Sequence, residues 1–573
     1  MNFKYNTSLL KCLFWFVVVP IVIYFSIFCV YTFPAIKYFS TRLYADMADG
    51  LVYYWNLWWV HKAVTQVHTT IWQTKWLYYP YGIYLYAHSL VPLNGFVTIF
   101  FWKFLTLLQI YNSFVIASYI MTGLFTFYLA YSQTKSYLAS VIAGFMFTFS
   151  SYRIAHTEGH MEFISTQWLP LFLLIWTNFV NMPNVLKGIV AAVVLYFNLL
   201  TTPYYFIFAS MTAMILVAIK IIDQRKLYTY LFRKQKNSSQ NKFELLQLGP
   251  KADVWVKKIF IGITAFLVTF VIVAYSYVYP LLQNQQSDFA GHDPTLFSTD
   301  LLAPFVPSAH SRFANLTKWY WQKLPGNIHE SSVYVGFVAL ILFVLILVSR
   351  AKLNFNAIKH WYILVFIFFT LSLGPVLHIG GIEVTSFFLP YSLVEAMPIF
   401  LKSGVPVRMM VIVMLSMSVI AAFGFSMLLK GAPWQRILAF VLMAVLSIEY
   451  LPRQLTLSSL SVPQYVFFLK NQENNAGVID LVANPSLRMY YQTVHEKPVQ
   501  FGYLSRIPKS TVGESVELQS VIDVYDYSLL YNKYNFKYWV SPSPLPKTIS
   551  CPQVVYQDVY VWIYDLAVLT NCQ

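Results

Sequence analysis

Charged residues are scarce in this sequence. Asp, Glu, Lys and Arg make up 11% of its 573 residues, against about 25% in typical soluble domains. Cysteines number four and form no Cys-x-x-Cys pair, and no Gly-rich phosphate loop or dinucleotide fingerprint is present. These absences exclude an ordinary soluble domain, a cysteine-based metal fold and the common nucleotide-binding folds.

Apolar residues are abundant instead, at 58% of the chain. Many apolar runs approach the roughly 20 residues that cross a bilayer as a helix. We therefore predict an α-helical polytopic membrane protein with about 11–13 spans. The runs lie near residues 10–33, 90–111, 113–131, 137–152, 162–181, 185–201, 203–222, 257–281, 332–350, 360–378, 405–429 and 434–451.

The net charge of +16 reflects topology rather than nucleic-acid binding. Lys and Arg gather in the loop 223–256 and in two short connections, which predicts that these segments face the cytoplasm of a plasma (inner) membrane. Alternation places the loops 34–89 and 282–331 outside. Three apolar runs lie between two segments on the outer side, so one of them must fail to cross; the short run 137–152 fits best.

The tail 452–573 has a different pattern. Short alternating segments at 477–482, 488–494, 537–541 and 558–566, separated by Gly, Pro and Asn, predict strands. We expect a transmembrane domain over 1–451 and a small α/β domain over 452–573 outside the cytoplasm. Cys551 and Cys572 lie in this domain, and their spacing leaves open whether they form a disulfide.

The first candidate site is the stretch "YADMADGLVYYWNLWWVHK" at 44–62. As a helix over 46–60, it would align Asp46, Asp49, Tyr53 and Asn56 on one stripe. Because a carboxylate in hydrocarbon is costly, that stripe should face a polar cleft while the tryptophans face lipid or protein. The alternative is that both acids are loop residues that cap the helix.

The second candidate is "SSYRIAHTEGHMEF" at 150–163. Arg153, His156 and His160 would stack on one helical face and could hold a phosphate, with Glu158 in the same cleft. The alternatives are a helix cap with polar loop residues, or a His-x3-His zinc pair. The zinc pair is the weaker of these because further ligands are missing from the pattern.

The third candidate is "PIFLKSGVPVRMM" at 398–410. Lys402 and Arg408 lie where outer residues meet a span, against the usual charge bias, so an anionic ligand would explain them. Snorkelling to lipid phosphates is the alternative. The loop 282–331 adds further polar residues, among them Arg312.

Acids and cations on one side of the membrane suit transfer from a phosphorylated donor. A carboxylate would take a proton from an acceptor hydroxyl while cations stabilise the departing phosphate. The order of motifs resembles that of the bacterial and archaeal integral-membrane C-type (GT-C) glycosyltransferases that use polyprenyl-phosphate sugars. The motifs are "DGLVYYWNLWW" (49–59), "HTEGHMEFISTQWLPL" (156–171), "SSVYVGFVAL" (331–340), "SLGPVLHIGG" (372–381) and "MYYQTVHEKPVQFGYLSRIP" (489–508).

The resemblance implies a multi-span bundle, a lipid-phosphate sugar donor and an inverting transfer. It assigns the role of catalytic acid to Asp49, with Asp46 as the second candidate. The local sequence here is Met-Ala-Asp-Gly, which differs from the acidic pair or the Gly-Asp that is usual in the family. The resemblance likens the tail to an accessory domain in which His495 and Arg506 either cover the cleft or hold the domain together.

The expected partners are a polyprenyl-phosphate-linked sugar, membrane lipids and an envelope lipid, glycan or protein acceptor, with no nucleic acid. No cofactor is specified, and a divalent cation is compatible with the acids. Two other classes compete with the enzyme. A lipid flippase or transporter predicts charges at mid-membrane depth, whereas a non-catalytic assembly protein for envelope polysaccharide would share the fold without the activity.

Overall fold

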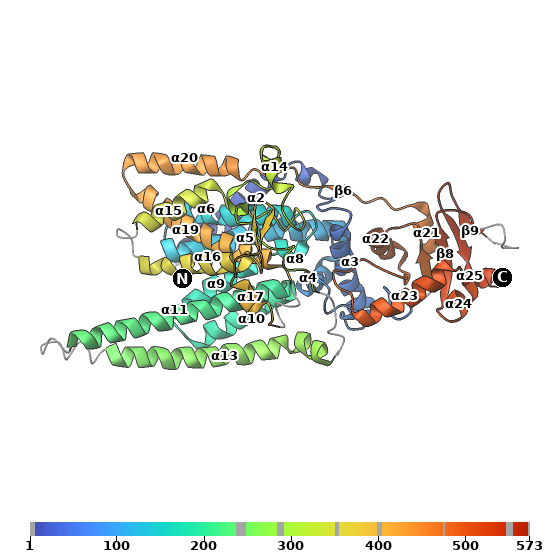
Figure 1. Ribbon diagram of the computed structural model, residues 1–573, viewed down its shortest axis with the longest axis horizontal. Coiled ribbons are helices and arrows are strands. Elements are labelled where there is room, and N and C mark those ends of the chain that lie inside the picture. Colours follow the sequence, from blue (N-terminus) through green and yellow to red (C-terminus); the bar gives the residue numbers. More distant parts are fainter. Residues whose placement is uncertain are drawn as a thin grey trace.

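A computed structural model describes residues 6–235, 248–283, 291–349, 355–397, 404–473, 476–545 and 554–570. The molecule is elongated, with a helical bundle at one end and a small domain containing a sheet at the other (Figure 1). Helix α3 (Asp49–Lys62) lies between the two parts.

The bundle consists of long apolar helices, as the composition requires. Six helical segments in the described chain are long and apolar enough to cross a membrane, and five others are apolar but have 10–17 residues. The polytopic membrane fold is therefore confirmed. The helices are α1 (Asn6–Leu13), α2 (Val19–Tyr31), α4 (Pro92–Phe101), α5 (Leu107–Thr134), α6 (Tyr137–Thr148), α9 (Trp168–Asn181), α10 (Val185–Thr201), α11 (Pro203–Gln235), α13 (Leu248–Gln283), α15 (Phe337–Val348), α16 (Lys359–Ser372), α19 (Met410–Lys430) and α20 (Pro433–Glu449).

Helices α4 and α6 are the two short helices among the three apolar runs that follow the first outer loop. Asn112 at the start of α5 donates to the carbonyls of Phe39 and Arg42 at 2.8 Å. At the far end, Tyr137 of α6 donates to the carbonyl of Trp15. Both α5 and α6 thus run along the first span. With ten and 12 residues, α4 and α6 are about 15 and 18 Å long, and neither is among the helices long enough to cross a membrane. Helix α4 is therefore a second candidate, beside the predicted run 137–152, for the run that does not cross.

Helix α6 packs tightly on α5 because small residues meet at the contact. A Cβ atom at Gly144 would lie 2.6 Å from both the carbonyl oxygen of Gly123 and the ring of Tyr24. We expect Gly144→Ala to destabilise the bundle by about 1–3 kcal/mol through overpacking, measured as a lower unfolding temperature in detergent. The matched control is Gly513→Ala in α23 (Lys509–Asp523), where nothing lies within 4 Å of the added atom; equal losses would contradict the packing explanation.

The tail forms the expected α/β domain, with one exception. Its sheet has the order β7-β8-β10-β9, with β7 parallel to β8 and the other pairs antiparallel. The strands are β7 (Gly477–Asp480), β8 (Phe536–Ser541), β9 (Val554–Gln557) and β10 (Trp562–Asp565), and the covering helices are α21 (Gln464–Lys470), α22 (Pro485–His495), α23, α24 (Tyr527–Asn532) and α25 (Leu566–Leu569).

The exception is the segment 488–494, predicted as a strand and observed within α22. Asn484 caps this helix by accepting a hydrogen bond from the Leu487 amide at 2.9 Å, and Pro485 occupies the first turn. Both are helix-start signals that outweigh the alternating pattern of the segment.

Helix α3 joins the two parts. The indole of Trp55 donates to Gln492 of α22 at 2.7 Å, and Lys62 pairs with Glu496 at 2.7 Å. A short strand pair, β1 (Arg42–Leu43) with β6 (Ser458–Ser459), adds a second connection. The tryptophans of α3 therefore face protein rather than lipid, and every residue of the helix after Asp49 is buried.

Two further expectations concern segments that the structure describes only in part. Helices α11 and α13 extend into the basic loop 223–256, whose centre, 236–247, lies outside the described residues. Cys551 and Cys572 also lie outside them, so the question of a disulfide between them falls outside the described residues. The described chain also contains the hairpins β2–β3 (Gln73–Thr74, Ile83–Tyr84) and β4–β5 (Leu377–Ile379, Ile382–Val384). Its short helices include α7 (Ser151–His156), α8 (Met161–Ile164), α14 (Lys318–Trp321) and α17 (Tyr391–Val394).

Candidate functional site

A cavity of about 740 Å³ lies where α3, the bundle and the tail domain meet. Its apolar lining comes mainly from α10, α11 and α13, whereas its polar lining comes from α3, the loops of the bundle and the tail. The cavity is therefore amphipathic. Its ionisable and imidazole side chains are Asp49, His88, His160, Glu162, His292, Glu330, Arg408 and Arg506.

Asp49 and His160 form the centre of the polar lining. The Nε2 atom of His160 lies 3.3 Å from Oδ2 of Asp49, and the Tyr503 hydroxyl also bonds to this carboxylate. Burial raises the pKa of Asp49, but the hydrogen bond and charge of His160 outweigh it, so the pKa lies below its ordinary value. For His160, burial lowers the pKa, but the hydrogen bond and charge of Asp49 outweigh burial and raise the pKa above its ordinary value. Both shifts favour a carboxylate–imidazolium pair.

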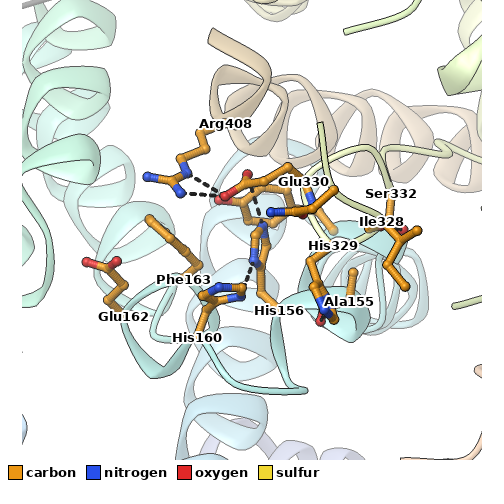
Figure 2. A network of polar contacts seen from close by, with 12 residues as sticks. Ala155, His156, His160, Glu162, Phe163, Ile328, His329, Glu330, Ser332 and Arg408 are labelled. Atoms are coloured by element: carbon orange, nitrogen blue, oxygen red, sulfur yellow. Dashed lines mark hydrogen bonds and ion pairs between the residues drawn. The ribbon is translucent and has the colours of Figure 1, made fainter. Parts of the chain in front are cut away.

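A chain of contacts continues from this pair to Arg408 (Figure 2). The Nδ1 atoms of His160 and His156 lie 3.2 Å apart, and Nε2 of His156 lies 3.7 Å from Glu330. Burial, followed by the charge of His160, keeps the pKa of His156 well below its ordinary value. Neutral His156 can then accept a hydrogen bond from Nδ1–H of His160 at its own Nδ1 and direct its Nε2–H toward Glu330.

Arg408 ends this chain in a buried ion pair. Its Nε donates to Glu330 Oε1 at 2.9 Å, and its Nη2 bonds to the same oxygen. The guanidinium lies over the rings of Phe163 and Tyr204, 4.1 and 4.5 Å from their centroids. Arg408 is therefore held rigidly at the cavity wall between two aromatic faces and a carboxylate.

Asp46 has a different environment from Asp49. It precedes α3 rather than belonging to it, so the predicted helix start at 46 was three residues early. Its Oδ1 accepts the amide hydrogens of Ala48 and Gly50 at 3.0 and 2.9 Å, and burial raises its pKa. These bonds order the turn before the helix, which matches the capping alternative for Asp46.

Gly159 keeps the loop after His156 close to both acids. A Cβ atom at this position would lie 3.0 Å from Cβ of Asp49 and 3.2 Å from both carboxylate oxygens of Asp46. The amide of Asp46 also donates to the carbonyl of Glu158. The two motifs predicted from sequence as separate clusters are thus directly packed together.

Tyr53 and Asn56 continue the predicted stripe of α3 in different ways. Tyr53 lines the cavity and donates to Glu162 at 3.1 Å. Asn56 lies behind the wall, where its side chain bonds to His88 at 2.9 Å and to the Ser89 carbonyl at 2.8 Å. Asn56 therefore positions a wall segment and does not itself face the cavity.

The predicted phosphate ligand Arg153 and the predicted cleft residue Arg312 do not line the cavity, and the predicted phosphate ligand Lys402 cannot be compared. Arg153 is fully buried, and its guanidinium donates to the carbonyls of Thr148 and Ile164 at 3.0 and 2.7 Å. Arg312 is exposed and does not line the cavity, and Lys402 lies outside the described residues. We therefore leave Arg153 and Arg312 out of the proposed site, together with His156, which acts behind His160.

Several lining residues were missed by the sequence analysis. Glu162 and Glu330 carried no motif signal of their own, although Glu162 stood inside the quoted second cluster. Tyr503 reaches Asp49 from the tail, more than 400 residues away along the chain. The two tail residues that the resemblance named differ from each other: Arg506 lines the cavity and donates to Tyr204 at 3.2 Å, whereas His495 is buried in the tail domain and accepts from the Lys497 amide at 3.0 Å.

Glu158 lies on the other side of the loop, away from the cavity lining. It forms a group with His310 and His329 in which one ligand atom of each lies within 4.8 Å of the others. Such a group can hold a metal ion. These three residues are therefore candidate ligands for the divalent cation considered in the sequence analysis.

The fold and the cavity define an integral membrane protein with a polar, aromatic-rich chamber at one end of its helical bundle. The chain belongs to the family of the domain of unknown function DUF6311, which matches residues 21–449. No curated protein matches the sequence significantly.

Among solved structures, the chain is similar to an archaeal oligosaccharyltransferase, AglB from Archaeoglobus fulgidus, in complex with an inhibitory peptide and a dolichol-phosphate. The TM-score is 0.46 at 12% identity, over 92% of this chain and 69% of that one. The apo form of an oligosaccharyltransferase from the same organism gives 0.46 and 12%, over 94% and 70% of the two chains. A complex with Zn and sulfate gives 0.45 and 12%, over 91% and 68%.

Proposed function

We propose that this protein is a membrane glycosyltransferase that moves a sugar from a polyprenyl-phosphate donor to an envelope lipid, glycan or protein acceptor. The observation that carries the proposal is the composition of the cavity. A half-buried carboxylate paired with a histidine, two arginines and an extended apolar lining share one chamber of about 740 Å³. A lipid-linked sugar phosphate requires all of these features together.

In the proposed reaction, Asp49 is the general base. An acceptor hydroxyl attacks the anomeric carbon of the sugar as Asp49 removes its proton, the bond from that carbon to the phosphate oxygen breaks, and polyprenyl phosphate leaves from the opposite face. The lowered pKa of Asp49 keeps the carboxylate ionised, which is the form that a general base requires. His160 and Tyr503 fix the direction of the carboxylate through their hydrogen bonds.

Arg408 and Arg506 are the proposed phosphate ligands. Glu330 takes the Nε and Nη2 groups of Arg408, so the Nη1 group is the part of the guanidinium directed to a phosphate. Arg506 approaches from the tail domain beside Tyr204. Two guanidinium groups would neutralise the charge that develops on the departing phosphate.

The apolar lining is the proposed site for the first isoprene units of the donor. Leu199, Phe206, Ile207 and Phe270 line the cavity from three helices of the bundle. Neighbouring side chains of α13, such as Val271 and Ile272, are exposed on the bundle surface, where lipid would cover them. A prenyl chain could thus continue from the cavity wall into the bilayer without contact with water.

Arg506→Gln should weaken donor binding more than turnover. Removing one of two phosphate ligands is expected to raise the KM for the donor about 10–100-fold, since a charge-assisted hydrogen bond is worth about 1.5–3 kcal/mol. Steady-state kinetics with varied donor concentration measure this change. Arg312→Gln is the matched control, because Arg312 is exposed and outside the cavity; an equal effect of both variants would contradict the assignment.

The function itself is tested with the purified full-length protein in lipid vesicles. Polyprenyl-phosphate sugars carrying a radiolabel are supplied with envelope extract as acceptor, and labelled product is separated from the donor. Transfer by the wild type supports the proposal. Movement of the donor between leaflets without any transfer would indicate a flippase, and neither activity, despite altered envelope polysaccharide in a deletion strain, would indicate an assembly protein.

A further inference from the structure

We propose that Glu158, His310 and His329 form a binding site for a first-row transition-metal ion such as Zn²⁺, directly behind the wall of the cavity. The three side chains come from two separate loops, 157–160 and 291–332. One ligand atom of each lies within 4.8 Å of the other two. The site is distinct from the Asp49–His160 pair, because none of the three residues lines the cavity.

His310 has its ligand atom fixed by its other nitrogen. The Ser332 hydroxyl donates its hydrogen to the carbonyl of Ile328 at 2.6 Å, so it can only accept from Nδ1 of His310, 2.8 Å away. Nδ1 therefore carries the hydrogen. In the neutral ring, Nε2 then presents a lone pair toward Oε2 of Glu158 at 3.6 Å.

His329 is oriented in the same way by a different partner. Its Nδ1 lies 3.2 Å from the carbonyl oxygen of Ala155, which can only accept. Nδ1 is thus the donor, and Nε2 of the neutral ring carries the lone pair. Histidines that bind metals commonly donate their second nitrogen to a carbonyl, hydroxyl or carboxylate, which fixes the ring for coordination.

Two imidazole lone pairs and a carboxylate that converge on one point need a positive charge between them. Two histidines with one carboxylate are a ligand set for Zn²⁺ and related ions. Metal bonds of about 2.0–2.2 Å place tetrahedral ligands roughly 3.4 Å apart, so small side-chain rotations would close the site. His310 is buried, whereas Glu158 and His329 are half-buried.

The position of the site suggests a role in holding the cavity wall. Glu158 is two residues before His160, which pairs with Asp49, and His329 is followed by Glu330, which pairs with Arg408. The rings of His329 and His160 lie 5.6 Å apart. A metal bound to both loops would therefore fix the position of the Asp49–His160 pair relative to the Arg408–Glu330 pair.

Metal content and thermal stability of the full-length protein in detergent test the proposal without any transfer assay. The wild type, stripped with a chelator and then given Zn²⁺ alone, should retain about one equivalent after desalting, measured by mass spectrometry of the metal. Its unfolding temperature should rise on Zn²⁺ addition. Glu158→Gln and His310→Gln should each reduce the retained metal at least about 10-fold and abolish the rise.

His378→Gln is the matched control, because His378 is a buried histidine 3.6 Å from the carboxylate of Glu383 and belongs to no such trio. This variant should retain metal like the wild type. If the ligand variants fail to fold, the metal content and the Zn²⁺-dependent shift of the wild type alone test the proposal. A wild-type protein that holds far less than one equivalent and shows no shift with Zn²⁺ overturns the proposal, as does equal metal retention by folded ligand variants. Transfer activity is not part of this readout, so failure here leaves the proposed glycosyl transfer unaffected.

Discussion

Asp49→Asn is expected to lower the turnover of sugar transfer by about 10²–10⁴-fold, the range attributed to a positioned general base. The amide keeps the size of the carboxylate and can still accept from His160 and Tyr503, so folding and donor binding should change little. An amide cannot take the proton of the acceptor hydroxyl. Single-turnover kinetics with saturating donor would show the loss in the chemical step.

Asp46→Asn is the matched control for this experiment. Asp46 acts through one oxygen that accepts two backbone amide hydrogens, and asparagine provides the same oxygen. We therefore expect turnover within a few-fold of the wild type, whereas Asp46→Ala should cost about 1 kcal/mol of stability through loss of the capping bonds. Loss of activity in Asp46→Asn with normal activity in Asp49→Asn would reverse the assignment. Normal transfer in both would show that neither acid is the base.

Arg408→Met should destabilise the bundle by about 3–5 kcal/mol, because it leaves the Glu330 carboxylate buried without its partner. Only 3% of the Glu330 side chain is exposed, so water cannot replace the guanidinium. A large fall in the unfolding temperature in detergent is the expected observation. The double variant Arg408→Met with Glu330→Gln removes both charges and should recover part of the loss.

The double variant separates stability from function. If Arg408 also binds the donor phosphate, the double variant should remain deficient in donor binding even where it is folded. A double variant no more stable than Arg408→Met would contradict the view that the uncompensated Glu330 charge causes the damage.

The sequence predicted the membrane fold, Tyr53 of the cavity lining, and three ionisable members of that lining, Asp49, His160 and Arg408. Each stands at the boundary between a polar stretch and an apolar run, where a charge is unusual enough to be noticed. The structure brings these three boundaries together at one end of the bundle, although they lie about 110 and 250 residues apart in the chain.

Other members could not be found this way. Glu330 belongs to a long polar loop in which no residue is unusual, and Tyr503 is one of 43 tyrosines, so neither carries a signal without its partners. The prediction that Arg153 binds phosphate was based on its charge beside two histidines. Its guanidinium instead donates to the carbonyls of Thr148 and Ile164 inside the bundle. A buried arginine with backbone partners looks identical in sequence to one that meets a ligand.

The segment 503–506 has a consequence for the order in which the protein matures. It completes the chamber around Asp49 and Arg408, yet the ribosome makes it after all of the apolar helices. A nascent chain whose helices are already inserted therefore has an incomplete chamber until the tail has folded against α3. Premature sugar transfer by a half-made protein is thereby avoided under the proposed function.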